Sequence, residues 1–354
     1  MSTVTRRGFV QHVAMTPLLV GAALAADART VGAAADAADP YSYVDPEMAA
    51  ALKKSGRNSE VPNAQNLAAW RAADKNSSVL SAPELQPRKM TVPGPAGQGD
   101  VNVLVFDPRP DNKNRPALLF MHGGGFIVGH ADTNLRLPQL AAQATGAFTV
   151  SVDYALAPEA RFPVALEQNY AVLAWLHRNA ARLGIDPTRI AVMGDSAGGA
   201  HAASLTIATR DRREFPIAYQ CLIYPVLDDR TGSTRQMPPY MGHFLWTPAA
   251  NRFAWSSLLG MPPGSASPPP GSVPAREKDL SGLPPAFIGV GSIDLFCDED
   301  IEYARRLAMA GISTELFIVP GAYHGFDIVA PEARLTVQFT DAWRSALKRG
   351  LGIA

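Results

Sequence analysis

Short apolar runs alternate with longer helical patterns over most of the chain. Seven runs have the character of strands, at residues 101–106, 117–122, 148–153, 190–194, 219–225, 286–291 and 314–319. Several are almost continuously apolar, which is typical of strands covered by helices on both faces. Four helical patterns separate or follow them, at residues 163–183, 197–210, 299–311 and 333–347. This alternation predicts an α/β fold with a mostly parallel central sheet flanked by helices.

The segment before the first strand has a helical pattern of its own. Asp45 is a good N-cap, and Pro46 suits the first position of a helix. A second helix is expected at about residues 63–73. Because this segment precedes every strand, we predict that residues 29–90 form a linker and an N-terminal helical cap, and that residues 91–354 form the main domain.

Residues 228–275 break the alternation of strands and helices. They hold two tryptophans and a proline-rich run, and the run predicts a surface loop. We interpret the segment as an insertion that contributes to a cap or to a pocket.

The first 28 residues are typical of a targeting signal rather than of a fold. Arg6 and Arg7 form a twin-arginine pair, and an apolar, alanine-rich stretch follows at about residues 13–26. The stretch is shorter than the about 20 apolar residues of a membrane span. We therefore predict twin-arginine export to the periplasm or the exterior, with no stable membrane anchor. A disordered or anchoring N-terminus is the alternative.

Composition and charge exclude several classes of protein. With 32 basic and 32 acidic residues in 354 and an apolar fraction of 47%, the chain is neither disordered nor a typical nucleic-acid binder. Two cysteines cannot staple a disulfide scaffold. Cys221 lies low in one predicted strand, and Cys297 lies beyond the upper end of another. At a rise of about 3.3 Å per residue, the two residues are further apart than the roughly 7 Å that a disulfide can bridge, so we predict two free thiols. The scattered histidines form no metal-ligand cluster, and no metal or cofactor is expected.

One motif predicts a nucleophile. Residues 194–199 read Gly-Asp-Ser-Ala-Gly-Gly and fit the pattern G-x-S-x-G between a predicted strand and a predicted helix. Such a turn lifts one hydroxyl above the sheet, and its glycines allow a strained backbone. This context makes Ser196 the candidate nucleophile. An ordinary glycine-rich turn is the alternative.

A second glycine-rich motif predicts an oxyanion hole. Residues 122–126 read His-Gly-Gly-Gly-Phe and follow a predicted strand. In the HGGG type of loop, backbone N–H groups stabilise an oxyanion together with the residue after the nucleophile. The donors here are Gly124, Gly125 and Ala197, whereas His122 shapes the loop. A phosphate loop is disfavoured because no G-K-[ST] follows.

A serine nucleophile needs a base and an acid that orients the base. Asp294 lies just past the run at 286–291, and His324 lies just past the run at 314–319, in the order Ser, Asp, His that this kind of turn requires. Asp298 and Asp300 are competing acids, but their positions suit the first turn of the next helix.

With these residues in place, the chain resembles the bacterial hormone-sensitive-lipase-like (family IV) esterases of the α/β-hydrolase superfamily over about residues 40–350. The resemblance rests on the motifs that start at His122, Asp153, Gly194, Asp294 and His324. It implies an α/β-hydrolase fold with a helical cap, and a serine carboxylesterase that needs no cofactor and favours small esters with short acyl chains.

Aromatic side chains are candidates for lining the acyl pocket. They are Phe126, Phe244, Trp246 and Phe326. Asp195 is expected to make hydrogen bonds within the loop, and Tyr154 and Glu159 are expected to be structural.

Two other functions stay open at this point. An amidase or arylformamidase-like enzyme would use the same three residues, and a small-molecule binding protein could share the fold without turnover. The residues do not decide the oligomeric state, and a homodimer is an open alternative.

Overall fold

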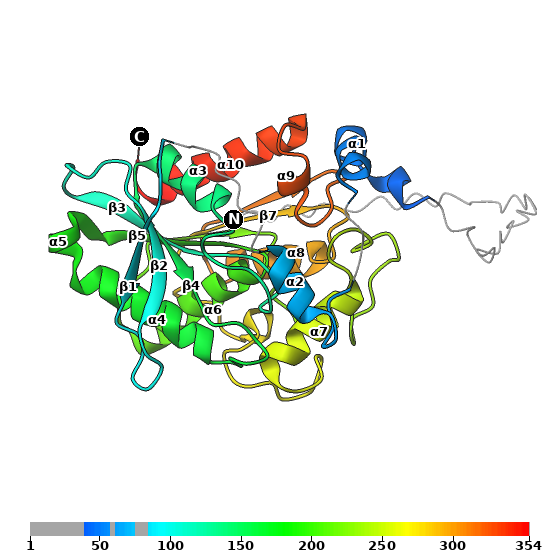
Figure 1. Ribbon diagram of the computed structural model, residues 1–354, viewed down its shortest axis with the longest axis horizontal. Coiled ribbons are helices and arrows are strands. Elements are labelled where there is room, and N and C mark those ends of the chain that lie inside the picture. Colours follow the sequence, from blue (N-terminus) through cyan, green and yellow to red (C-terminus); the bar gives the residue numbers. More distant parts are fainter. Residues whose placement is uncertain (1–38, 57–60, 75–83, 354) are drawn as a thin grey trace, which may run out of the picture. The chain divides into compact units, whose positions relative to one another are not determined.

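The computed structural model describes residues 39–56, 61–74 and 84–353 (Figure 1). The predicted signal at residues 1–28 and the first part of the predicted linker lie outside the described residues. Every helix within the described ranges is too short or too polar to span a lipid bilayer.

The centre of the fold is an eight-stranded sheet in the order β1-β2-β4-β3-β5-β6-β7-β8. β1 and β2 pair antiparallel, β2 pairs antiparallel with β4, and all the other pairs are parallel. The strands are β1 (Arg88–Val92), β2 (Val101–Phe106), β3 (Arg115–Met121), β4 (Phe148–Asp153), β5 (Ile185–Asp195), β6 (Tyr219–Ile223), β7 (Ala286–Gly291) and β8 (Thr314–Val319). The α/β-hydrolase fold expected from the resemblance is confirmed.

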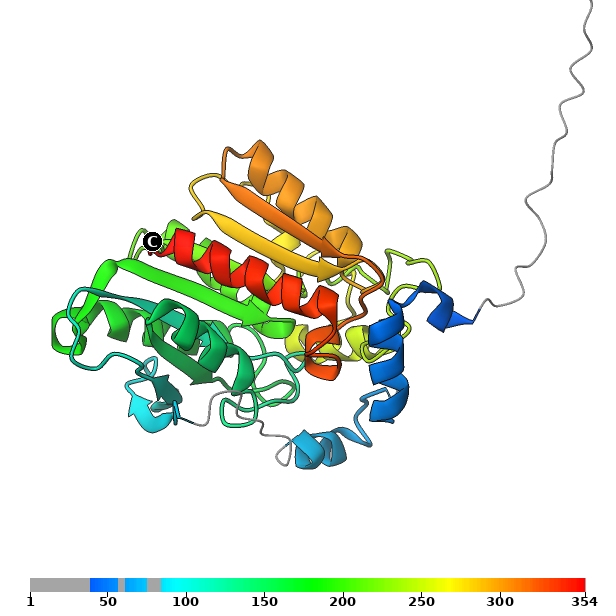
Figure 2. The same cartoon turned by 90° about the horizontal axis from the view of Figure 1, so that it is seen from above.

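Helices cover both faces of this sheet. Their bounds are α1 (Pro46–Ser55), α2 (Leu67–Asp74), α3 (Arg136–Thr145), α4 (Val164–Arg178), α5 (Ala180–Leu183), α6 (Ala197–Arg212), α7 (Pro248–Leu259), α8 (Cys297–Met309), α9 (Phe326–Val329) and α10 (Arg334–Gly350). Figure 1 shows α3 and α10 on one face and α4 and α6 on the other, and Figure 2 shows α10 running across the sheet. Two short 3₁₀ helices, Pro40–Tyr43 and Pro274–Arg276, complete the described elements.

The alternation of side chains along β3 shows why both faces are covered. Leu119 and Met121 pack into the core under α4, α6 and α8, whereas Leu118 and Phe120 pack into the core under α3 and α10. Successive side chains of a strand point to opposite faces, so a continuously apolar strand needs a helical layer on each side.

The structure adds elements that the apolar pattern did not predict. β1 is a mostly exposed edge strand, so it has no apolar run to reveal it. α3 was missed, and α7 lies inside the insertion at 228–275 that was expected to be irregular. The single helix expected at 163–183 is two helices, α4 and α5, which meet at Asn179.

The two N-terminal helices, α1 and α2, fall within residues 29–90, the range of the predicted linker and cap. Asp45 caps α1 by accepting the N–H groups of Glu47 and Met48, at 3.0 and 3.3 Å. α2 begins at Leu67, later than expected, because the residues before it form a turn. Arg71 of α2 donates to the Ile127 carbonyl at 2.8 Å, and this bond ties α2 to the segment that follows the triple glycine.

Arg71 also shows the role of Glu159, because the two side chains are paired. Its guanidinium makes two hydrogen bonds to the Glu159 carboxylate, at 2.9 and 2.8 Å, and this partner lowers the pKa of that carboxyl. Glu159 is therefore a structural anchor for α2, as expected.

The two cysteines, Cys221 and Cys297, are free and buried, which confirms the prediction of two thiols.

Candidate active site

Ser196 occupies a sharp turn between β5 and α6. Its backbone has φ 53° and ψ −120°, a conformation that L-residues rarely adopt. Its N–H donates to the Ile223 carbonyl at 2.8 Å, which fixes the turn against β6. A Cβ atom on Gly194 would come within 2.2 Å of the Gly198 oxygen, and one on Gly198 within 2.0 Å of the Met121 oxygen. Only glycine fits at these two positions, so the motif supplies what the strained turn needs.

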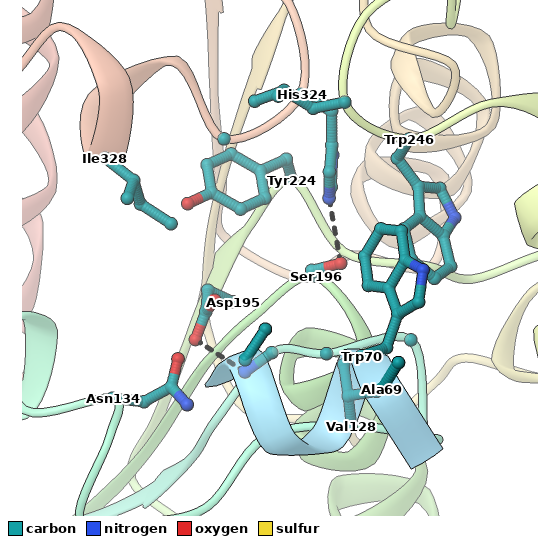
Figure 3. A pocket seen from close by; sticks show the side chains of 16 residues that line it. Ala69, Trp70, Val128, Asn134, Asp195, Ser196, Tyr224, Trp246, His324 and Ile328 are labelled. Carbon is teal, nitrogen blue, oxygen red and sulfur yellow. Dashed lines mark hydrogen bonds between the residues drawn. The ribbon is translucent and has the colours of Figure 1, made fainter. Parts of the chain in front are cut away.

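His324 and Asp294 form one hydrogen-bonded chain with Ser196. The Ser196 Oγ lies 2.9 Å from His324 Nε2, and His324 Nδ1 lies 2.9 Å from Asp294 Oδ2 (Figure 3). The second carboxylate oxygen, Oδ1, accepts the N–H of Phe296 at 3.0 Å. A carboxylate only accepts, so Nδ1 carries the proton and Nε2 is left to accept from the serine. The structure brings together the three residues that the sequence singled out.

The competing acids lie elsewhere. Asp298 and Asp300 are both in the first turn of α8, as the sequence predicted. Asp298 is paired with Arg235 at the surface. Asp300 is fully buried, and its carboxylate makes no hydrogen bond to the described residues. Burial, with the charges of Glu299 and Asp294, raises the pKa of Asp300 well above its usual range. Neither acid makes a recorded hydrogen bond to His324.

The triple glycine curls beside Ser196. Gly124 has φ 119°, and its carbonyl accepts the N–H groups of Ile127 and Val128, at 3.1 and 2.9 Å. A Cβ atom on Gly124 would come within 2.0 Å of the Val128 oxygen. Among the described residues, no recorded hydrogen bond uses the N–H of Gly124, Gly125 or Ala197. These three N–H groups are the predicted oxyanion donors, and Gly124 and Gly125 line the cavity, whereas Ala197 is buried directly after Ser196.

His122 supports this loop from beneath. Its Nδ1 lies 2.7 Å from the Gly123 oxygen, and its ring stacks on Tyr154 with centroids 4.2 Å apart. The Tyr154 hydroxyl donates to the His122 carbonyl at 2.6 Å. Both side chains are buried, so they hold the loop in shape and do not face the cavity.

Asp195 joins the oxyanion loop to the serine turn. Its Oδ1 accepts the N–H of Gly123 at 3.0 Å, and a Cβ atom on Gly123 would come within 2.4 Å of its Oδ2. Burial, followed by the nearby charge of Asp327, raises the pKa of Asp195 to about 7. The hydrogen bond within the loop that the sequence predicted is present.

A cavity of about 650 Å³ opens above these groups. Its size is that of a pocket for a small organic molecule. Figure 3 shows Ser196 and His324 between two groups of lining side chains. The lining residues are Ala69, Trp70, Ala73, Gly123, Gly124, Gly125, Val128, Asn134, Asp195, Ser196, Tyr224, Leu245, Trp246, His324, Gly325 and Ile328.

Only one of the four aromatic residues expected in the pocket lines it. Trp246 does, and it packs so closely on the loop that a Cβ atom on Gly125 would lie 2.1 Å from its ring. The expectation is wrong for the other three, which are buried in the core. Phe126 packs on Trp255, Phe244 packs on Tyr41, and Phe326 packs on Phe339.

Sequence reasoning missed several lining residues. Trp70 reaches the cavity from α2, and Asn134 reaches it from the loop before α3. Tyr224 directly follows β6, and its place at the C-terminal end of a parallel strand is a signal that could have identified it.

Among the described residues, no group of three or more His, Cys, Asp and Glu side chains is arranged to hold a metal ion.

The raised pKa of Asp195 predicts a pH effect on stability. Between about pH 4 and about pH 7, folded Asp195 keeps a proton that the unfolded chain has released. The contribution of Asp195 to the free energy of unfolding of the wild type therefore falls as the pH rises through this range. Asp195→Asn keeps the acceptor for Gly123 but carries no such proton. We expect the variant to gain stability relative to the wild type over this range, by on the order of a few kcal/mol.

Urea unfolding of both proteins across this pH range measures the effect. Other buried acids, such as Glu299 and Asp300, are present in both proteins and cancel in the difference. A difference in stability that does not change with pH would mean that Asp195 is ionised throughout.

The comparisons with known proteins agree with this geometry. A sequence profile of the family described as alpha/beta hydrolase fold matches residues 118–328. Carboxylesterase NlhH of Mycobacterium tuberculosis is 36% identical over 277 residues, which cover 76% of this chain and 84% of that protein. The ethyl acetate hydrolase of Pseudomonas putida is 34% identical over 213 residues, which cover 59% of this chain and 65% of that protein.

Solved structures extend the similarity to nearly the whole described chain. A bacterial heroin esterase superposes with a TM-score of 0.76 at 33% identity and covers 88% of this chain and 99% of its own. An esterase from the archaeon Pyrobaculum calidifontis superposes with a TM-score of 0.77 at 30% identity and covers 86% of this chain and 98% of its own. The segment matched by the family profile contains Gly124, Ser196, Asp294 and His324.

Proposed function

Because this chain belongs to the alpha/beta hydrolase family, in the hormone-sensitive-lipase-like branch, we propose that it is a serine carboxylesterase that hydrolyses small esters through Ser196, His324 and Asp294. The observation that carries the proposal is the unbroken chain of two hydrogen bonds, each 2.9 Å long, that ends at a hydroxyl in the cavity. The relatives of this chain include carboxylesterases and an ethyl acetate hydrolase.

Acylation follows from the positions of the protons. His324 Nε2 accepts the proton of Ser196 as Oγ attacks the ester carbonyl carbon. Asp294 holds the ring in the tautomer with a proton on Nδ1 and stabilises the positive charge that develops on the ring. The carbonyl oxygen becomes an oxyanion, which the N–H groups of Gly124, Gly125 and Ala197 stabilise. His324 then gives its proton to the leaving alcohol oxygen as the ester bond breaks.

Deacylation repeats the same steps with water. His324 takes a proton from a water molecule, and the hydroxide oxygen attacks the acyl carbon bound to Ser196. The tetrahedral intermediate collapses, Ser196 Oγ leaves and regains its proton from His324, and a carboxylic acid is released. No group beyond the described side chains and backbone is required by these steps.

The cavity supports a preference for short acyl chains. Trp246 packs directly on the oxyanion loop, and Trp70 of α2 also lines the cavity, so two bulky rings limit the room for a long acyl chain (Figure 3). We expect kcat/KM for p-nitrophenyl esters to be highest for acetate or butyrate and to fall for octanoate and palmitate.

An acyl series with a matched anilide tests both the chain preference and the bond that is cleaved. A rate that rises with chain length would contradict the short-acyl proposal. Faster turnover of butyranilide than of phenyl butyrate would make the protein an amidase, and binding without turnover of either would make it a binding protein.

The cellular location stays a proposal that rests on residues 1–28. We propose that twin-arginine export delivers the folded protein to the periplasm or the exterior without a stable membrane anchor. Mass spectrometry of the exported protein is expected to find an N-terminus near Asp27 or Arg29, and an intact Met1 would contradict it.

A further inference from the structure

The catalytic cavity has two sides of different chemistry. Figure 3 shows Trp70 and Trp246 on one side of Ser196, and Asn134, Asp195 and Tyr224 on the other. The first side offers apolar ring surface. We call the second the acceptor side and define it by Asn134, Asp195 and Tyr224. Nothing in the hydrolytic mechanism uses the side chains of Asn134 or Tyr224.

Asn134 presents its carbonyl oxygen and not its nitrogen. Its Nδ2 donates to the carbonyl oxygen of His130 at 3.1 Å and to Thr133 Oγ1 at 3.2 Å. The hydroxyl of Thr133 itself donates to the His130 carbonyl, so both partners of Nδ2 are acceptors. This network fixes the amide orientation, because an oxygen could not replace the nitrogen there. Among the described residues, no recorded hydrogen bond uses the Asn134 Oδ1.

The hydroxyl proton of Tyr224 is also used within the protein. Its hydroxyl donates to Asp327 Oδ1 at 2.8 Å, and Asp327 Oδ2 accepts from Arg136 at 3.0 Å. The ring lies against His324, with centroids 4.8 Å apart. The lone pairs of the Tyr224 oxygen are therefore the part of the hydroxyl that remains for a ligand.

Asp195 adds a carboxyl group to these two oxygens. It accepts one N–H from Gly123, and no recorded ion pair within the described chain links it to a cation. Its neighbour Asp327, in contrast, is paired with Arg136. Burial raises the pKa of Asp195 to about 7, and a ligand that brings a positive charge favours the ionised form of this carboxyl.

We propose that the acceptor side binds a hydrogen-bond donor of the substrate, so that the enzyme prefers esters with a hydroxyl or a protonated amine on one part and an apolar group on the other. The acceptor side offers the Oδ1 of Asn134 and the lone pairs of the Tyr224 oxygen, and the donors of both side chains are already used within the protein. A buried acceptor that a substrate leaves unpaired costs binding energy, and a donor removes that cost. This inference rests on the proposed esterase function and specifies its substrate class.

Two pairs of esters test it. Ethyl β-hydroxybutyrate and ethyl isovalerate differ by a hydroxyl in place of a methyl on the acyl part. Aminoethyl butyrate and propyl butyrate differ by an ammonium in place of a methyl on the alcohol part. Each kcat/KM is divided by the rate of alkaline hydrolysis of the same ester, which removes the intrinsic reactivity. We expect the donor ester of at least one pair to be preferred by about ten- to a hundredfold.

Variants locate the preference. Asn134→Leu removes the free oxygen and is expected to reduce the preference about tenfold. Since this change also breaks two hydrogen bonds within the loop, Tyr224→Phe is the second variant, because it keeps the ring beside His324 and the loop bonds of Asn134, and removes the hydroxyl with its single bond to Asp327. Ile328→Val is the matched control, because it changes the size of another lining residue but no polar atom. The control is expected to keep the preference.

The outcomes separate this inference from the function on which it rests. Hydrolysis of the apolar esters with no preference in either pair, or a preference that both variants retain, would overturn the inference and leave the esterase standing. No hydrolysis of any of the four esters would overturn both. A preference in the hydroxyl pair alone assigns a hydroxy ester, and one in the ammonium pair alone assigns an amino ester.

Discussion

Replacing Ser196 with alanine is expected to lower kcat/KM for p-nitrophenyl butyrate by more than about 10⁴-fold. The change removes the only hydroxyl in hydrogen-bond contact with His324 among the described residues, and with it the atom that would form the acyl-enzyme. Loss of a triad serine costs up to about 10⁶-fold in a well-studied protease, because the remaining groups cannot replace covalent catalysis. The oxyanion donors and the cavity stay in place, so a small residual rate is expected.

The fold is expected to survive this substitution. Alanine has the same backbone limits as serine at φ 53°, so the turn is strained equally in both proteins. Ser204→Ala is the matched control, since Ser204 is a buried serine of α6, the helix that follows Ser196, and does not line the cavity. Circular dichroism and thermal unfolding check the fold of each variant. A Ser196→Ala protein that retains more than about a thousandth of the activity would exclude Ser196 as the nucleophile.

Replacing Asp294 with asparagine is expected to lower kcat by about 10⁴-fold. The Asp294 Oδ1 accepts the N–H of Phe296, so an asparagine is expected to keep its oxygen there and to turn its nitrogen toward His324. That nitrogen is a donor, and it forces the proton of the imidazole from Nδ1 to Nε2. A protonated Nε2 cannot accept the proton of Ser196. The expected loss is therefore in kcat, with a much smaller change in KM.

Asp298→Asn is the matched control for this prediction. Asp298 lies four residues further along, is half exposed and is paired with Arg235. The control is expected to lower the rate by less than about threefold, because an exposed ion pair contributes little. If Asp298→Asn and Asp294→Asn lose activity equally, or if Asp294→Asn stays within about tenfold of the wild type, the orienting acid has been misassigned.

The polar candidates were predictable because each one is tied to a local pattern. Ser196 follows from the glycines that its turn requires, and Asp294 and His324 follow from their places just beyond the ends of β7 and β8. Parallel strands present these ends at one edge of the sheet, so chain order alone brings the three side chains together.

The aromatic residues of the pocket were not predictable in this way. Phe126 stands beside the oxyanion motif, but its φ of 67° turns the chain, and its ring packs on Trp255 and His201. Neighbouring positions along the chain do not reveal on which side of a turn a ring will lie.

Trp70 and Asn134 had the opposite problem. Trp70 belongs to α2, far from the motifs in the sequence, and tertiary contacts, such as the bonds of Arg71 and the packing of Leu67, bring that helix to the cavity. Asn134 carries no local signal at all. Its orientation depends on the carbonyl of His130 and the hydroxyl of Thr133, which are fixed only once the loop has folded.

Covalent labelling tests the central claim, that Ser196 is the nucleophile, most directly. The wild-type protein is treated with a serine-reactive organophosphate and digested, and the modified residue is located by tandem mass spectrometry. The account predicts one label per chain, on Ser196, with loss of activity in proportion to labelling, and no label on the Ser196→Ala variant. A stoichiometric label on another residue, or full labelling of Ser196 with activity retained, would contradict it.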